Sequence, residues 1–163
     1  MNDFLLWIEN LSYSTWLRES LSIWAYPTFL FAHTLGMSIV AGGATVINLA
    51  LLGLWPKHVP IKALGRFYPL IWAGFWLNAF TGVSIFMREA TNYGRNPVVY
   101  VKLSFVFAGV ALLLAMRKRV FDGPELDSGP VSRSAKWIAS WSLFCWFAAI
   151  IAGRLIAYAG SVH

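Results

Sequence analysis

Four long apolar runs, separated by short polar segments, dominate the hydrophobic pattern of this chain. They cover residues of about 21–55, 64–87, 97–117 and 136–159. A helix rises about 1.5 Å per residue, so each run is long enough to cross the roughly 30 Å of hydrocarbon in a bilayer. Prolines and Asn-, Asp- or Gly-containing turns lie between the runs. The pattern predicts an all-α protein, an integral membrane four-helix transmembrane bundle in a single membrane domain over residues 1–163.

Residues 3–19 have a different pattern, in which apolar residues recur at partly helical spacing among polar ones. This segment is too polar to cross a bilayer, and its Trp and Tyr residues are typical of the headgroup level. We therefore expect a short N-terminal interfacial helix that lies on the membrane surface. The segment has neither a basic start nor a small-residue cleavage site, so no removable signal peptide is expected.

Composition supports a membrane protein. Hydrophobic residues make up 58% of the chain, charged residues only 12%, and the mean hydropathy is +0.61. A soluble domain of this size needs more polar residues to cover its surface. The net charge of +6 arises from bases at the ends of the apolar runs, so nucleic acid is not an expected partner. The single cysteine, Cys145, excludes an intrachain disulfide.

The distribution of Lys and Arg predicts the orientation of the bundle. Eight bases belong to the first and third connections between runs, and five lie on or near the other side. By the positive-inside rule, those two connections are cytoplasmic and both termini are periplasmic. The predicted location is the bacterial inner membrane, with the lipid bilayer as the first partner. The eight bases are Lys57, Lys62, Arg66, Arg117, Lys118, Arg119, Arg133 and Lys136.

Three basic residues on three different runs are expected at one depth in the outward half of the bundle. They are His33, Lys102 and Arg154, and no Asp or Glu lies within the apolar runs beside them. A buried charge needs a partner, and arginine does not lose its proton in proteins. The sequence therefore predicts an anionic ligand from outside the chain.

Haem b meets these requirements. The neutral imidazole of His33 is a suitable iron ligand, and Lys102 and Arg154 can hold the anionic propionates. Gly36, one turn from His33, would let a macrocycle approach the helix, and Trp76 would lie beside it. No second histidine lies within an apolar run. The iron would then be five-coordinate, or its second axial ligand would be Met37, Met87 or a residue of another subunit.

Copper and a quinone are the alternative ligands. His33 and Met37 are four residues apart on one helix face, a spacing and ligand set that suit Cu(I), although the neighbouring cations would repel a metal ion. Tyr100, Asn78 and Thr81 offer the hydrogen-bonding groups of a quinone pocket. A hydrogen bond between helices is a further interpretation of His33.

Three stretches carry a resemblance to known proteins: YPTFLFAHTLGMSIVAGG at 26–43, NYGRNPVVYVKLSF at 92–105 and IIAGRLIAY at 150–158. They resemble an uncharacterised family of bacterial four-helix inner-membrane proteins. They are distantly similar to the membrane domains of copper-resistance D proteins and to cytochrome b561-like bundles. The resemblance implies a four-helix membrane fold and the positions of His33, Lys102 and Arg154. Of the several membrane histidines of b561-type proteins, only His33 is present.

We therefore expect a haem b-binding protein that passes electrons between a periplasmic and a membrane partner. It would be a subunit of a respiratory or redox complex, or a homo-oligomer. The alternative is a non-enzymatic membrane subunit, or a copper-handling or assembly factor, with no haem. The sequence contains no hydrolase, phosphate-loop or zinc motif, and it does not indicate whether the protein is an enzyme.

Overall fold

The computed structural model describes residues 2–20, 22–54, 56, 60–123 and 131–159, and every regular element within these ranges is helical. The predicted limits at residues 1, 21, 55 and 163 lie outside the described residues. The elements are α1 (Asn2–Glu9), α2 (Ser12–Glu19), α3 (Ala25–Leu51), the 3₁₀-helix η1 (Ile61–Phe67), α4 (Tyr68–Arg88), α5 (Ala90–Arg95), α6 (Pro97–Met116), the π-helix η2 (Arg117–Phe121) and α7 (Arg133–Ala159).

Four helical segments are long and apolar enough to cross a membrane, which confirms the predicted fold class at this level. They are Ala25–Leu51, Ile61–Arg88, Pro97–Phe121 and Arg133–Ile156. Two of them extend past the predicted runs, because η1 leads directly into α4 and η2 continues α6. The bases of η2 do not end the helix, since Lys and Arg are good helix formers.

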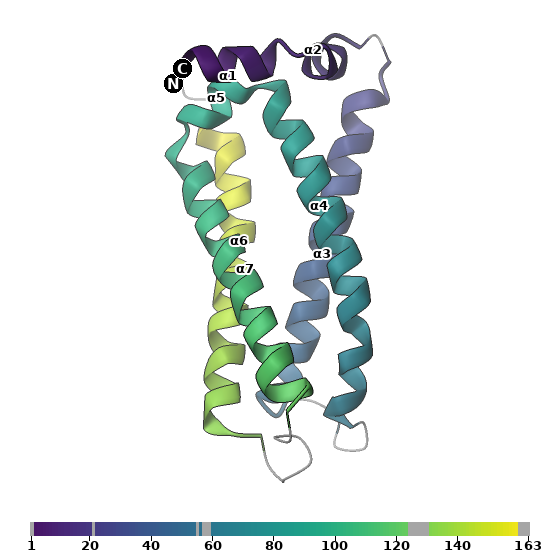
Figure 1. The fold of residues 1–163 in the computed structure, drawn as a ribbon, viewed down its shortest axis with the longest axis vertical. Coiled ribbons are helices and arrows are strands. Elements are labelled where there is room, and N and C mark those ends of the chain that lie inside the picture. The colour runs from purple at the N-terminus through teal and green to yellow at the C-terminus, as the bar shows by residue number, and fades with distance from the viewer. Residues whose placement is uncertain (1, 21, 55, 57–59, 124–130, 160–163) are drawn as a thin grey trace.

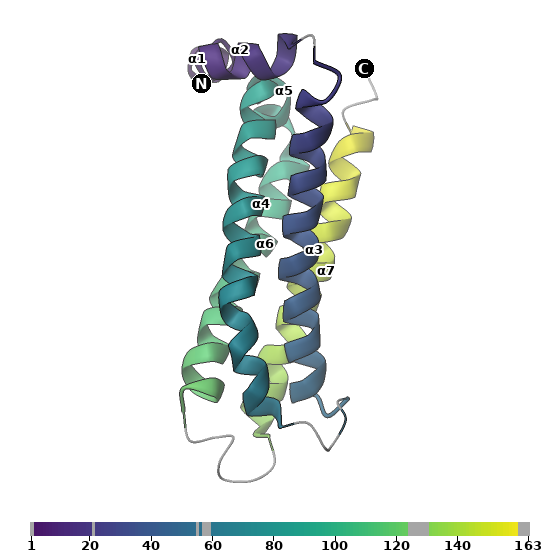
Figure 2. The same ribbon diagram turned by 90° about the vertical axis from the view of Figure 1, so that its right-hand side faces the viewer.

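The four long helices form two antiparallel hairpins, α3 with α4 and α6 with α7, and α3 also packs against α7 (Figures 1 and 2). Most of the large buried side chains lie in the half of the bundle next to the α3–η1 and η2–α7 connections. They include Ile47, Leu51, Leu64, Tyr68, Leu113, Met116, Val120 and Trp146. This core fixes the relative positions of the two hairpins, and His33 and Lys102 lie beyond it, toward the other end.

Helix α3 ends in a Schellman motif. Gly53 adopts a φ of +89°, and its N–H donates to the carbonyl of Ala50 at 3.1 Å. The N–H of Leu54 reaches back to the carbonyl of Leu49 at 2.9 Å. This pair of hydrogen bonds satisfies carbonyls at the end of the helix, and the left-handed backbone at position 53 favours glycine.

The N-terminal segment forms two helices in place of the single helix predicted over 3–19. Both lie across the end of the bundle, at a large angle to the long helices (Figures 1 and 2). Helix α1 ends at Glu9 and α2 begins at Ser12. Across this junction, the hydroxyl of Ser14 donates to the carbonyl of Ile8 at 2.8 Å. Leu5 and Leu17 are buried beneath these helices, so the pair caps the bundle end.

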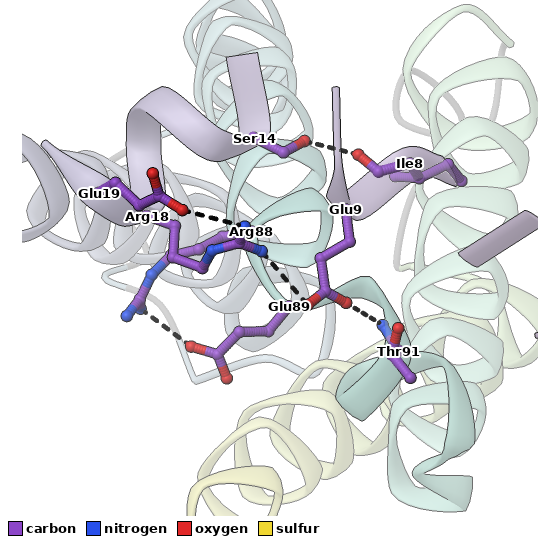
Figure 3. Close-up of polar contacts among 8 residues, drawn as sticks. All are labelled: Ile8, Glu9, Ser14, Arg18, Glu19, Arg88, Glu89 and Thr91. Carbon is purple, nitrogen blue, oxygen red and sulfur yellow. Dashed lines mark hydrogen bonds and ion pairs between the residues drawn. The ribbon is translucent and has the colours of Figure 1, made fainter. Parts of the chain in front are cut away.

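A polar network fastens this cap to the α4–α5 corner (Figure 3). The carboxylate of Glu9 accepts the backbone N–H of Thr91 at 2.9 Å and pairs with Arg18 at 3.3 Å. The hydrogen bonds from Thr91, followed by the charge of Arg18, hold the pKa of Glu9 below its usual value near 4.5. Nearby, Arg88 pairs with Glu89 at 3.3 Å and its guanidinium lies 4.1 Å from the ring centre of Tyr26.

Candidate intramembrane site

The ring of His33 is held against α4. Its Nδ1 lies 3.1 Å from the carbonyl oxygen of Asn78 and 3.1 Å from the hydroxyl of Thr81. In return, the Asn78 side-chain amide donates to the carbonyl of His33 at 2.8 Å. Gly82 makes room for the ring, because a Cβ there would lie 3.0 Å from His33 Cε1. Two reciprocal contacts therefore fix both the ring and the helix that carries it.

The neighbours of His33 determine its tautomer. A carbonyl oxygen only accepts hydrogen bonds, so the Nδ1 that faces Asn78 carries the proton. The Thr81 hydroxyl already donates to the carbonyl of Leu77 at 2.7 Å and is therefore also an acceptor toward the ring. In the neutral imidazole, the lone pair is then on Nε2. Among the described residues Nε2 has no hydrogen-bond partner, which leaves it available to a ligand.

Lys102 approaches His33 from the other hairpin. Its aliphatic chain packs over Gly153 of α7, where a Cβ would lie 3.6 Å from Lys102 Cε and 3.8 Å from Nζ. The side chain is partly buried, and its charge acts electrostatically on the His33 ring. Within the described ranges, Lys102 forms no hydrogen bond or ion pair. An unpaired ammonium at membrane depth is costly, so this position favours an anion.

Arg154, unlike Lys102, has no electrostatic effect on His33 in this structure. Its side chain is exposed on α7, as are those of Leu155 and Tyr158, whereas Ala152 is buried. Among the described residues it has no ion pair or hydrogen bond. Of the three basic residues expected at one depth, His33 and Lys102 interact, and Arg154 lies on the exposed side of its helix.

Gly36 packs α3 against α4. A Cβ at this position would lie 2.8 Å from both the backbone nitrogen of Asn78 and the carbonyl oxygen of Gly74. The α4 backbone therefore occupies the space on the side of Gly36 where a Cβ would project. The expected place of Gly36 beside a cofactor stays a prediction.

The other predicted site residues, Met37, Trp76 and Tyr100, do not converge on one place. Met37 is partly buried on α3, within one turn of His33. Trp76 is 67% exposed on α4, and Tyr100 is also exposed. The Tyr100 hydroxyl donates to the carbonyl of Gly94 at 2.7 Å, which fastens α6 to α5. Of these side chains, only Met37 is placed near the imidazole by its position on the same helix.

The site residues that sequence reasoning weighted least are on α4. Asn78 and Thr81 were quinone candidates, and Gly82 was assigned no role in the site, yet these three hold the His33 ring. Their spacing of three and four residues puts them on one helix face. A polar and small stripe at that spacing, within an otherwise apolar run, is the signal that could have found them.

Two further observations bear on which ligand fits. A small apolar cavity of about 10 Å³ lies between Tyr68, Trp72, Val110 and Trp146, but neither His33 nor Lys102 lines it. In the part of the chain that the structure describes, no three His, Cys, Asp or Glu side chains cluster as a metal site. The donor set at His33 is thus one imidazole nitrogen and one ammonium, which fits an axial ligand and an anion-binding group.

Comparison with protein-family models, with curated proteins and with solved structures found no match for this chain.

Proposed function

We propose that this chain is a haem b-binding subunit of a membrane redox complex, and that His33 is the axial ligand of the haem. The observation that carries the proposal is the fixed imidazole, with Nδ1–H directed to a backbone carbonyl and Nε2 free. Metal-ligating histidines usually donate their other ring N–H to a carbonyl or carboxylate, which fixes the tautomer and makes the ligand more basic.

Each residue of the pair has a separate role in this proposal. His33 Nε2 would hold the iron, and the ammonium of Lys102 would hold a propionate. Bound haem would supply a one-electron iron couple. Because Arg154 is exposed, the second propionate is assigned to no residue of the bundle interior. Met37, or a residue from another copy of the chain, is the candidate for the second axial position.

The same proposal places the chain in the bacterial inner membrane with both termini periplasmic. The support is the concentration of eight bases in the first and third connections. Helices α1 and α2 would lie at the outer membrane–water boundary. The exposed Phe4, Trp7 and Trp16 support that position, because aromatic rings are enriched at headgroup level.

A second candidate is a structural or assembly subunit without haem. One observation favours it: all hydrogen bonds of the His33 ring are made to α4, so the ring already has a structural role as a contact between helices. In this case Lys102 would interact with lipid or with a partner subunit. Among the described residues no three His, Cys, Asp or Glu side chains cluster, so copper handling would need Met37 or ligands from outside those residues beside His33.

The optical spectrum of the full chain, purified in mild detergent from cells supplied with a haem precursor, tests the proposal. We expect a Soret band with reducible α and β bands, lost in His33→Ala and retained in the control His58→Ala, whose histidine is outside the apolar runs. Lys102→Gln should keep the band but lose haem more rapidly on dilution. A well-folded, colourless wild-type protein refutes haem binding. Equimolar copper in that protein would favour the copper role.

A further inference from the structure

Residues in the first two turns of α7 line a hollow on the surface of the bundle. Arg133, Lys136, Trp137 and Ser140 line it, and its volume is about 150 Å³. Their spacing puts them on one side of the helix. The hollow lies at the end of the bundle opposite α1 and α2 (Figure 1).

Two cations line this hollow, and the described part of the chain offers them no acidic partner. Arg133 and Lys136 are exposed, and among the residues that the structure describes neither forms an ion pair. By contrast, Arg117 at the same end lies 3.9 Å from the carboxylate of Asp122. The N-terminus of α7 adds partial positive charge to the same place. The hollow therefore favours an anion.

The hydrogen-bonding groups narrow the chemistry of that anion. Ser140 already donates its hydroxyl hydrogen to the carbonyl of Lys136 at 3.0 Å, so it is not a free donor. The available donors are the Arg133 guanidinium, the Lys136 ammonium and the Trp137 indole N–H. Three donors around one concave surface suit the oxygens of a phosphate.

The apolar side chains next to the hollow indicate its depth. Trp137 is 58% exposed, and one and two turns further along α7 lie Trp141 and Phe144, both 53% exposed. Tryptophan at the end of a span is typical of the headgroup level, where basic pockets at the cytoplasmic side bind anionic lipid headgroups. A lipid whose phosphate occupies the hollow would cover Trp141 and Phe144 with its acyl chains.

We propose that Arg133, Lys136 and Trp137 form a binding site for the phosphodiester headgroup of an anionic glycerophospholipid. The two cations select against zwitterionic lipids, whose positive headgroup they repel. This site does not depend on haem binding, because it needs only the α7 span and its basic start. It would anchor the cytoplasmic end of α7 at a defined depth.

Native mass spectrometry of the full chain, titrated with phosphatidylglycerol or phosphatidylcholine in detergent, tests this site. We expect preferential retention of phosphatidylglycerol. The double variant Arg133→Gln/Lys136→Gln should bind it roughly thirtyfold more weakly, because each of these two bases would contact the headgroup phosphate and contribute about 1 kcal/mol. The control Lys118→Gln/Arg119→Gln removes the same charge from η2 and should change binding by less than about threefold.

Three results would overturn the proposal. Equal binding of the two lipids would show that the hollow does not select an anionic headgroup. An equal loss in both double variants would show a general effect of surface charge. Competition by inorganic phosphate at concentrations similar to the lipid would show a free-anion site without acyl-chain contacts. Trp137→Leu separates the indole N–H from the charges, and we expect it to weaken lipid binding while preserving the preference for the anionic lipid.

Discussion

Replacing Gly36 with alanine adds a methyl group at the close approach of α3 and α4. The new carbon would lie 2.8 Å from the backbone nitrogen of Asn78 and 2.8 Å from the carbonyl oxygen of Gly74. Both are backbone atoms of a helix, so they cannot rotate away as a side chain could. The two helices must therefore move apart by several tenths of an ångström.

The expected cost follows from two opposing effects. Overpacking of this kind costs about 1–3 kcal/mol. Alanine also favours a helix over glycine by roughly 0.5–1 kcal/mol. We therefore expect a net loss of about 1–2 kcal/mol in the free energy of unfolding. The same separation lengthens the 2.8 Å bond from the Asn78 amide to the carbonyl of His33.

Gly42 provides a matched control on the same helix, because a Cβ there meets nothing within 4 Å. We expect Gly42→Ala to be neutral or to stabilise by up to about 1 kcal/mol. Unfolding by SDS titration in mixed micelles measures both variants, and ¹⁵N NMR of the imidazole reports whether Nδ1 stays protonated. Equal stability changes in the two variants would refute the α3–α4 packing from which the orientation of His33 follows.

Three other expectations concern the cap, the core and a turn. The pKa of Glu9 in the folded protein lies below its ordinary value near 4.5, so the carboxylate stabilises the fold above that pH, and this stabilisation is lost as pH falls through the folded pKa. Glu9→Gln should remove the same stabilisation at neutral pH. Hydrogen exchange at the Thr91 amide, corrected for intrinsic rate, should then be about tenfold faster, and an unchanged rate would contradict the cap contact. A double-mutant cycle of Asn48→Ala and Ser142→Ala should give a coupling of about 0.6 kcal/mol for their buried 3.1 Å hydrogen bond, and zero coupling would argue against it. Gly53→Ala should destabilise by about 1–2 kcal/mol in SDS titration, because φ is +89° there, and unchanged stability would exclude the Schellman geometry.

The spans could be predicted because length and hydropathy alone decide whether a helix crosses a bilayer. Their ends were less accessible to sequence reasoning. The third run was expected to end near residue 117, but η2 carries the helix through Lys118 and Arg119 to Phe121. Lys118 and Arg119 end the apolar run, because charged side chains favour water. They do not end the helix, because lysine and arginine are good helix formers. The break after Glu9 also depends on a contact, the hydrogen bond from Ser14 to the carbonyl of Ile8.

Only part of the candidate site could be predicted, because the sequence does not show which face of each helix points into the bundle. In a soluble helix, polar residues mark the exposed face, but in a membrane helix both the lipid-facing and the buried faces are apolar. The sequence therefore led us to predict one depth for Lys102 and Arg154, but it contained no signal for the directions in which their side chains point. The rotation of each helix is set by small residues such as Gly36, Gly82 and Gly153, which determine where two backbones or a side chain approach closely.

The two ends of the bundle have different physical roles, and this explains why an unpaired cation is tolerated. Lipid chains are as apolar as the helices, so tight packing near Ile47 and Met116, rather than hydrophobic driving force, fixes the two hairpins. The stability that this core supplies offsets the cost of an unpaired cation in the other half of the bundle, next to α1 and α2. In that half, the charge of Lys102 acts on His33, and neither residue has an acidic partner among the described residues, which destabilises the chain. A ligand that brings negative charge for Lys102, and a metal ion or hydrogen-bond donor for the lone pair of His33 Nε2, relieves that cost, so binding and bundle stability should be thermodynamically coupled.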